Sequence, residues 1–161
     1  MKPSDFIAAV GPAAQDNMRH SGIPASFTVA EAALESGWGT SGLTLNAKNL
    51  FGVKADASWK GEVLSMPTKE YINGDWGTYD AKWRKYEDWN EAIDDHAAFL
   101  TENSRYKDAF AIPHIGIDDT QPWGETFAEA VAKAGYATDP EYASKIITIM
   151  RAHGLAQLDL G

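Results

Sequence analysis

The stretch AEAALESGWGTSGLTLNAKNLFG, residues 30–52, contains the residues on which the fold prediction depends. An alanine-rich apolar run ends at the carboxylate Glu35, and two glycines flank a tryptophan at 37–39. The run predicts a helix over about 25–36 with a wide apolar face. The glycines predict that the chain turns away directly after it. A charged side chain is therefore expected at a helix end, beside an indole.

A β-hairpin is predicted farther along the chain. The segment from about 61 to 86 is rich in β-prone residues, and Asn73-Gly74 is a favoured two-residue hairpin turn. A turn at 75–77 (Asp-Trp-Gly) is the alternative. In an extended strand Thr68 and Glu70 share one face, because side chains alternate.

The rest of the chain predicts helices and connecting loops. The first 20 residues predict a helix or helix pair, with an interruption in either case near Gly11-Pro12. A loop with a short helical turn is expected over 37–59. Further helices are predicted at about 88–102, 104–110, 120–135 and 139–154. The first of these has a capping-box-like start, from Asp88 to Glu91. The expected architecture is α+β: one domain over 1–161, with a mostly helical body and a hairpin lobe at about 60–87.

Composition excludes several classes of function. The formal net charge is −9 and no Lys/Arg cluster occurs, which argues against nucleic acid as a partner. The chain has no cysteine, so disulfides and thiol catalysis are excluded. No signal peptide is recognised at the N-terminus, and no run approaches the roughly 20 apolar residues of a membrane span. The four histidines, His20, His96, His114 and His153, show no metal-ligand spacing, so no metal or cofactor is expected.

Two glutamates, Glu35 and Glu70, are candidates for acid–base chemistry. Glu31 and Glu35 are four residues apart and share a helix face, and like charges at that spacing raise the pKa of one of them. The indole of Trp38 adds desolvation in the same direction. The alternative is that both glutamates are solvated surface residues.

Glu70 is the second candidate, because glutamate is depleted in strands. Solubility of an edge strand is the alternative reason for its presence. A helix-end acid and a hairpin carboxylate on either side of a sugar chain would suit glycoside hydrolysis, which needs an acid and a second carboxyl group.

Several motifs, in the same order, resemble the glucosaminidase family of bacterial cell-wall hydrolases, which includes flagellar rod hydrolase domains, autolysins and phage lysins. They are AALESGWGTS (32–41), NLFGVKA (49–55), TKEYINGDWGTYDAKWRKYEDWNEAIDDHAAFL (68–100), NSRY (103–106) and AGYATDPEYASKI (134–146). The resemblance implies a lysozyme-like fold with a substrate cleft between the helical body and the hairpin. It also implies hydrolysis of the β-1,4 bond after N-acetylglucosamine in peptidoglycan, by an endo-β-N-acetylglucosaminidase.

The resemblance also implies roles for individual residues. Glu35 matches the general acid, Glu70 the hairpin glutamate and Tyr136 a functionally important tyrosine. Residues expected to contact sugar are Trp38, Asn49, Phe51, Tyr71 and Tyr86. The chain departs from the family at Glu31, where glutamine is usual. If Glu31 faces the cleft, it is expected to raise the pKa of Glu35 or to pair with a basic group.

Other functions stay open at this stage. A muramidase or lytic transglycosylase would act on the same polymer, and a non-catalytic wall-binding or assembly module would bind it without product. The expected partner is a peptidoglycan glycan strand. The protein is expected to act as a monomer at the cell wall, in the periplasm or outside the cell. Without a signal peptide, export would use a holin, a phage particle or a secretion apparatus.

Overall fold

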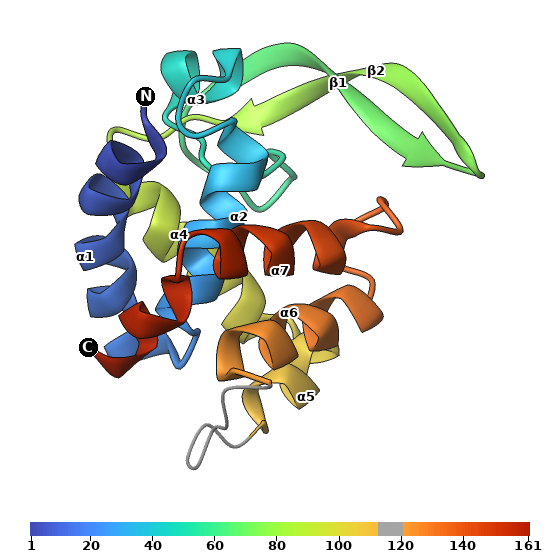
Figure 1. Cartoon of the computed structure of the whole chain (residues 1–161). Helices are drawn as coiled ribbons and strands as arrows, with labels where there is room; N and C mark the ends of the chain where they lie inside the picture. Colours follow the sequence, from blue (N-terminus) through green and yellow to red (C-terminus); the bar gives the residue numbers. More distant parts are fainter. Residues whose placement is uncertain (113–120) are drawn as a thin grey trace.

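The computed structural model describes residues 1–112 and 121–161. A helical body carries one antiparallel hairpin (Figure 1), which confirms the predicted α+β class. In chain order the elements are α1 Pro3–Ser21, α2 Ala25–Ser36, α3 Gly42–Ala47, β1 Val63–Ile72, β2 Asp75–Arg84, α4 Trp89–Glu102, η1 Ser104–Tyr106, α5 Lys107–Phe110, α6 Trp123–Lys133, α7 Tyr142–Ala152 and η2 Leu155–Leu160.

Helix α2 is the centre of the body. It has the predicted bounds, and α1, α6, α7 and η2 pack around it. Its apolar side chains are almost fully buried, among them Phe27 and Val29 at 0% exposed. A helix that is apolar on nearly all sides is stable only inside a protein core. The body is therefore assembled around α2.

Helix α1 differs from the prediction near Gly11-Pro12. It runs unbroken from Pro3 to Ser21 with Pro12 inside it, so the expected interruption is wrong. Proline costs the helix one backbone hydrogen bond and crowds the preceding turn. Burial of Phe6, Val10 and Ala14 on one face of α1 offsets that cost.

The hairpin has the predicted turn. Asn73 and Gly74 both adopt positive φ, 55° and 82°, and Ile72 pairs with Asp75. This is the geometry that two-residue hairpin loops favour. The alternative turn at 75–77 is therefore wrong.

The hairpin base is anchored to the body. Arg84 Nη1 lies 2.9 Å from Asp95 Oδ2 on α4, and the Tyr86 hydroxyl donates to the same oxygen at 2.5 Å. From this base the two strands arch above the amino-terminal end of α7 (Figure 1). The hairpin lobe thus forms a roof over one side of the helical body.

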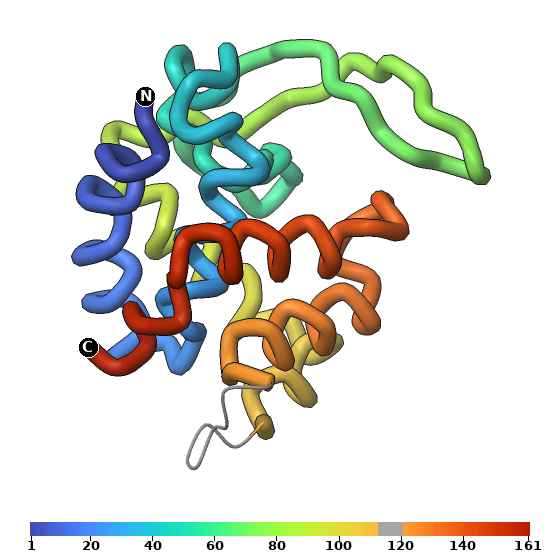
Figure 2. Tube along the Cα trace, viewed as in Figure 1, coloured from blue at the N-terminus to red at the C-terminus, as the bar shows by residue number. Residues whose placement is uncertain are grey.

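The remaining helices follow the prediction closely. Asp88 caps α4 by accepting a hydrogen bond from the Glu91 N–H at 2.8 Å, as its sequence position indicated. Helix α6 begins at Trp123, and Thr120, the predicted start, lies outside the described residues. The short η2 segment was not predicted; it lies beside α1 (Figure 2), where Gln15 Nε2 donates to the Leu158 carbonyl at 3.1 Å. In the described part of the chain no helix is long and apolar enough to cross a membrane.

Replacing the interior proline of α1 tests this account of the helix. We expect Pro12→Ala to raise the free energy of unfolding by about 1–2 kcal/mol, because it restores a backbone donor and removes the ring clash. Pro3→Ala is the matched control, since Pro3 occupies the first helical turn, where proline is favourable. Denaturant unfolding measures both. A Pro12→Ala protein no more stable than the parent would contradict an unbroken α1.

Candidate active site

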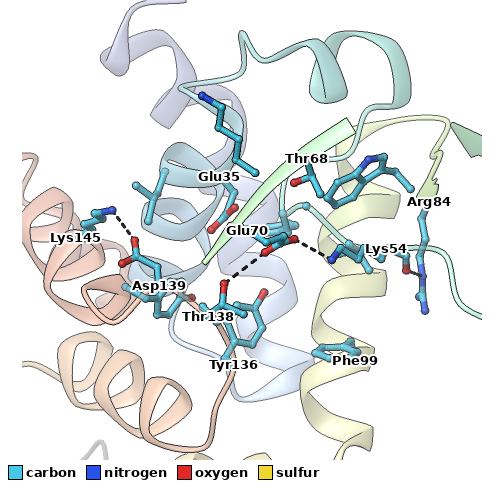
Figure 3. A pocket seen from close by; sticks show the side chains of 18 of the residues that line it. Glu35, Lys54, Thr68, Glu70, Arg84, Phe99, Tyr136, Thr138, Asp139 and Lys145 are labelled. Atoms are coloured by element: carbon cyan, nitrogen blue, oxygen red, sulfur yellow. Dashed lines mark hydrogen bonds and ion pairs between the residues drawn. The ribbon is translucent and has the colours of Figure 1, made fainter. Parts of the chain in front are cut away.

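A cleft of about 600 Å³ lies between the hairpin and the helical body. Its walls come from the carboxyl end of α2, the loop after α3, strand β1 and the segment that leads into α7 (Figure 3). Of the residues predicted to be catalytic, Glu35, Glu70 and Tyr136 all line it. The fold thus brings together three side chains that are far apart in the sequence.

Glu35 occupies the last turn of α2. Gly37, with φ of 57°, ends the helix in the left-handed conformation, so the chain leaves and the carboxyl group stays uncovered. Gly52, also at positive φ (65°), passes closely: a Cβ there would lie 3.5 Å from Glu35 Oε2. Two glycines therefore shape the backbone around this acid.

The pKa of Glu35 is raised to about 8. Desolvation by the surrounding protein is the largest cause, followed by the negative charges of Glu31, Glu70 and Asp139, while Lys145 lowers it. The carboxyl group is nevertheless open to solvent. Both observations fit a concave site, where water reaches the group from one side and protein encloses it on the others. Glu35 is thus a protonated acid at neutral pH.

Glu70 reaches the cleft from strand β1. Its Oε1 lies 2.8 Å from Lys54 Nζ, and its Oε2 accepts a hydrogen bond from Thr138 Oγ1 at 3.4 Å. In Figure 3 the carboxyl groups of Glu35 and Glu70 point into the same space. Lys54 supplies a positive charge beside Glu70, whereas Glu35 has negative neighbours. The two carboxyl groups therefore have opposite electrostatic surroundings, which suits one acid and one carboxylate.

Tyr136 contacts two buried side chains behind the cleft wall. Its hydroxyl donates to Glu31 Oε1 and lies 2.9 Å from His96 Nε2. Burial and the charge of Glu31 raise its pKa well above the usual value, so the phenol stays neutral. Because its proton already bonds to Glu31, Tyr136 suits a positioning role better than proton donation to a substrate.

Glu31 does not face the cleft. It is 0% exposed, so the alternative of a solvated surface residue is wrong for Glu31. Its Oε2 lies 3.1 Å from His96 Nε2, and its charge raises the pKa of Glu35. Glu31 therefore acts on Glu35 and contacts His96 from the core, and not from the cleft as the prediction supposed.

One of the five residues expected to contact sugar lines the cleft. It is Phe51, whose ring also stacks on His96 at 4.0 Å and an interplanar angle of 10°. Tyr71 packs against Trp76, its partner across the hairpin, at 5.4 Å. Of these two hairpin aromatics Trp76 reaches the cleft and Tyr71 does not.

Three other expected contacts have structural partners instead. Trp38 packs edge-on against Phe6, with ring centroids 5.6 Å apart. The buried Asn49 amide donates to the carbonyls of Val53 and Arg84 at 3.0 and 2.8 Å, and so joins the loop to the hairpin base. Tyr86 is 3% exposed and bonds to α4. Within the described residues, none of the three lines the cleft.

Sequence reasoning missed four residues of the site. His96 had been set aside as an isolated histidine, and Lys54, Trp76 and Thr138 carried no motif assignment of their own. Only tertiary contacts identify them, since Lys54 and Thr138 approach Glu70 from distant parts of the chain. Within residues 1–112 and 121–161, no three His, Asp or Glu side chains form a group that could hold a metal ion, and His114 lies outside these residues.

The raised pKa of Glu35 predicts a pH-dependent stability difference. The unfolded chain releases this proton near pH 4.5 and the folded protein near pH 8, so folding becomes less favourable as pH rises between these values. Glu35→Gln removes the effect. We expect the variant to gain stability over the parent from pH 4.5 to 8 and the gain to level off above. The free energies of unfolding of both proteins, determined across this pH range, measure the difference, and the exposed Glu102→Gln is the charge control. A stability difference that shrinks as pH rises would contradict the raised pKa of Glu35.

Comparisons with known proteins agree with this site. The glucosaminidase family, described as mannosyl-glycoprotein endo-β-N-acetylglucosaminidase, matches residues 11–155. The chain is 40% identical to the peptidoglycan hydrolase FlgJ of Salmonella typhimurium over 151 residues, covering 91% of this chain and 45% of that protein. It is 38% identical to the exo-glucosaminidase LytG of Bacillus subtilis, covering 83% and 45%. The chain thus spans less than half the length of these relatives.

Solved structures show the same fold. A peptidoglycan hydrolase mutant from Sphingomonas sp. A1 superposes with a TM-score of 0.80 at 34% identity, covering 96% of each chain. A C-terminally truncated glycoside hydrolase domain of Salmonella typhimurium FlgJ superposes with a TM-score of 0.71 at 39% identity, covering 94% of this chain and 97% of that one. These neighbours confirm the expected lysozyme-like fold. With its fold, cleft and sequence in agreement, the chain belongs to the glucosaminidase family.

Proposed function

We propose that the protein hydrolyses the β-1,4 glycosidic bond after N-acetylglucosamine in peptidoglycan, as an endo-β-N-acetylglucosaminidase. The observation that carries the proposal is Glu35: a carboxyl group with a pKa near 8, in an open cleft, facing a second carboxylate. Such an acid holds its proton at neutral pH and can donate it. The family match and the relatives' names support the substrate class. The cell wall follows as the place of action.

The cleft geometry supports a division of labour. Glu35 protonates the glycosidic oxygen as its bond to the anomeric carbon breaks, and positive charge develops on the sugar ring. Glu70 then stabilises that charge or takes a proton from the attacking water. Lys54 and Thr138 hold its two oxygens, so the carboxylate is fixed rather than mobile. Tyr136 lines the cleft with its hydroxyl bonded to Glu31, so it serves a positioning role and does not donate a proton.

Glu35→Gln tests the acid directly. The amide keeps the size of the side chain and cannot donate the catalytic proton, so we expect kcat/KM on purified peptidoglycan to fall about 10²–10⁴-fold. Glu102→Gln, on the exposed end of α4, is the control and should keep the parent rate. Near-parental activity of Glu35→Gln would remove Glu35 from the mechanism.

The products of the same digestion, read by mass spectrometry, separate the candidate functions. The proposal requires new reducing N-acetylglucosamine ends inside long chains, whereas release of terminal units alone would indicate exo-cleavage, as in the name of LytG. Reducing N-acetylmuramic ends would indicate a muramidase, and anhydromuramic ends a lytic transglycosylase. Binding without product would indicate a non-catalytic module.

Glu70→Ala tests the second carboxylate. We expect a loss of about 10²-fold in kcat and partial recovery with azide, because a small anion can enter the space left by the side chain and attack the sugar. Lys69→Ala is the control from the same strand, and azide should not change its rate. If Glu70→Ala keeps the parent rate without azide, the acetamido group of the substrate supplies the assistance instead.

A further inference from the structure

A fully buried carboxylate lies one helical turn before the proposed acid. Glu31 is 0% exposed, and an isolated ionised carboxylate is strongly unfavourable in a protein interior. The fold gives it two polar neighbours: the Tyr136 hydroxyl donates to Oε1, and His96 Nε2 lies 3.1 Å from Oε2. A group that costs this much to bury and is surrounded this closely calls for a functional explanation.

His96 is held as tightly as Glu31. It is 1% exposed, its ring stacks on Phe51 at 4.0 Å, and the Phe27 ring lies beyond at 6.5 Å. Because the Tyr136 proton points at Glu31, the Tyr136 oxygen is free to accept from His96 Nε2, 2.9 Å away. The proton of His96 therefore belongs on Nε2, where it faces both the phenol and the carboxylate.

We propose that Glu31, held by His96, is a positioning residue of the active site: it fixes the Tyr136 hydroxyl behind the cleft wall and keeps the proton on Glu35 by its negative charge. The first role follows from the hydrogen bonds that join the three side chains. The second follows from the shared helix, since residues four apart lie on one face. The proposal rests on the proposed function only in that Glu35 is the acid.

Among the charged groups near Glu35, Glu31 has the largest effect on the pKa of Glu35. After desolvation, Glu31 is the largest cause of the raised pKa, ahead of Glu70 and Asp139. Each of the latter two has a lysine against it, Lys54 on Glu70 at 2.8 Å and Lys145 on Asp139 at 2.5 Å. These lysines weaken the influence of both carboxylates on Glu35.

The titratable groups around the Glu31 carboxylate are two neutral phenols and one imidazole. Tyr142, on α7, is buried, and within the described residues its hydroxyl has no hydrogen-bond partner. Its pKa, like that of Tyr136, is raised well above the usual value by burial and then by the charge of Glu31. His96 Nε2, on α4, lies 3.1 Å from Glu31 Oε2. With these neighbours in place, Glu31 is still the largest charged contributor to the raised pKa of Glu35.

Glu31→Gln tests the charge and keeps the acceptor for Tyr136. From the pKa of Glu35 we expect the kcat/KM profile of the parent to fall near pH 8, and that of Glu31→Gln to fall about 1 pH unit lower. At acid pH we expect kcat of Glu31→Gln within about threefold of the parent. Glu125→Gln is the matched control: Glu125 is also buried, at 6% exposed, but it pairs with Arg151 outside the cleft. Its profile should coincide with that of the parent. A Glu31→Gln profile that also coincides overturns the proposal.

Glu31→Met separates positioning from charge. Met removes the charge and the acceptor together, so the alkaline limb of the kcat/KM profile should shift as in Glu31→Gln. We expect kcat to fall at least tenfold further, because the Tyr136 hydroxyl loses the acceptor of its proton. Equal kcat in folded Met and Gln variants would overturn the positioning role.

A measurement on the unmodified protein covers the case in which these variants do not fold. By NMR, the Tyr136 hydroxyl proton should give a separate signal in slow exchange with water, because it lies between Glu31 and His96. A Tyr136 hydroxyl proton in fast exchange with water overturns the proposal. This measurement needs no substrate, so its failure is distinct from a failure of the proposed glycosidase activity.

Discussion

The enclosure of α2 is the constraint on which the rest of the structure depends. A helix that is apolar on nearly every side needs neighbours all around, and α1, α6, α7 and η2 supply them. Only its last turn reaches a free surface, where Gly37 ends the helix at the cleft. The position of a glutamate along this helix therefore decides its environment: Glu31 is sealed in the core, and Glu35, one turn later, meets solvent from a largely enclosed position.

The hairpin depends on the same body for its function. Two strands alone are only marginally stable, so an isolated hairpin would not hold Glu70 in place. Asp95 on α4 fixes its base through Arg84, and Thr138 meets Glu70 near the entry to α7. The cleft is thus closed by contacts between segments that the helical core has already positioned. The proposed catalytic pair consists of one residue at the end of the central helix and one on a supported lobe.

Local chemistry explains which features were predictable from the sequence. The Asn73-Gly74 turn and the Asp88 cap depend on a few neighbouring residues, and both were predicted correctly. The break at Pro12 was predicted wrongly. The sequence shows the local cost of the proline, but it does not show the core packing that outweighs this cost. The contacts of His96 and Asn49 likewise depend on tertiary packing. A histidine 65 positions from Glu31 has no local signal, and the match of Asn49 to a motif does not tell sugar contact from backbone contact.

The active site combines two unfavourable arrangements that an apolar core can sustain. Burying Glu31 costs free energy, because Tyr136 bonds to Oε1 while Oε2 has no hydrogen-bond partner among the described residues. Holding a proton on Glu35 above its usual range costs stability as pH rises. Neither arrangement would persist on a loosely packed helix, which could rotate to expose the carboxylate. Because α2 is surrounded, rotation would expose its apolar side chains instead, and that cost is larger. The packing that specifies the fold is therefore also what keeps an acid protonated at neutral pH.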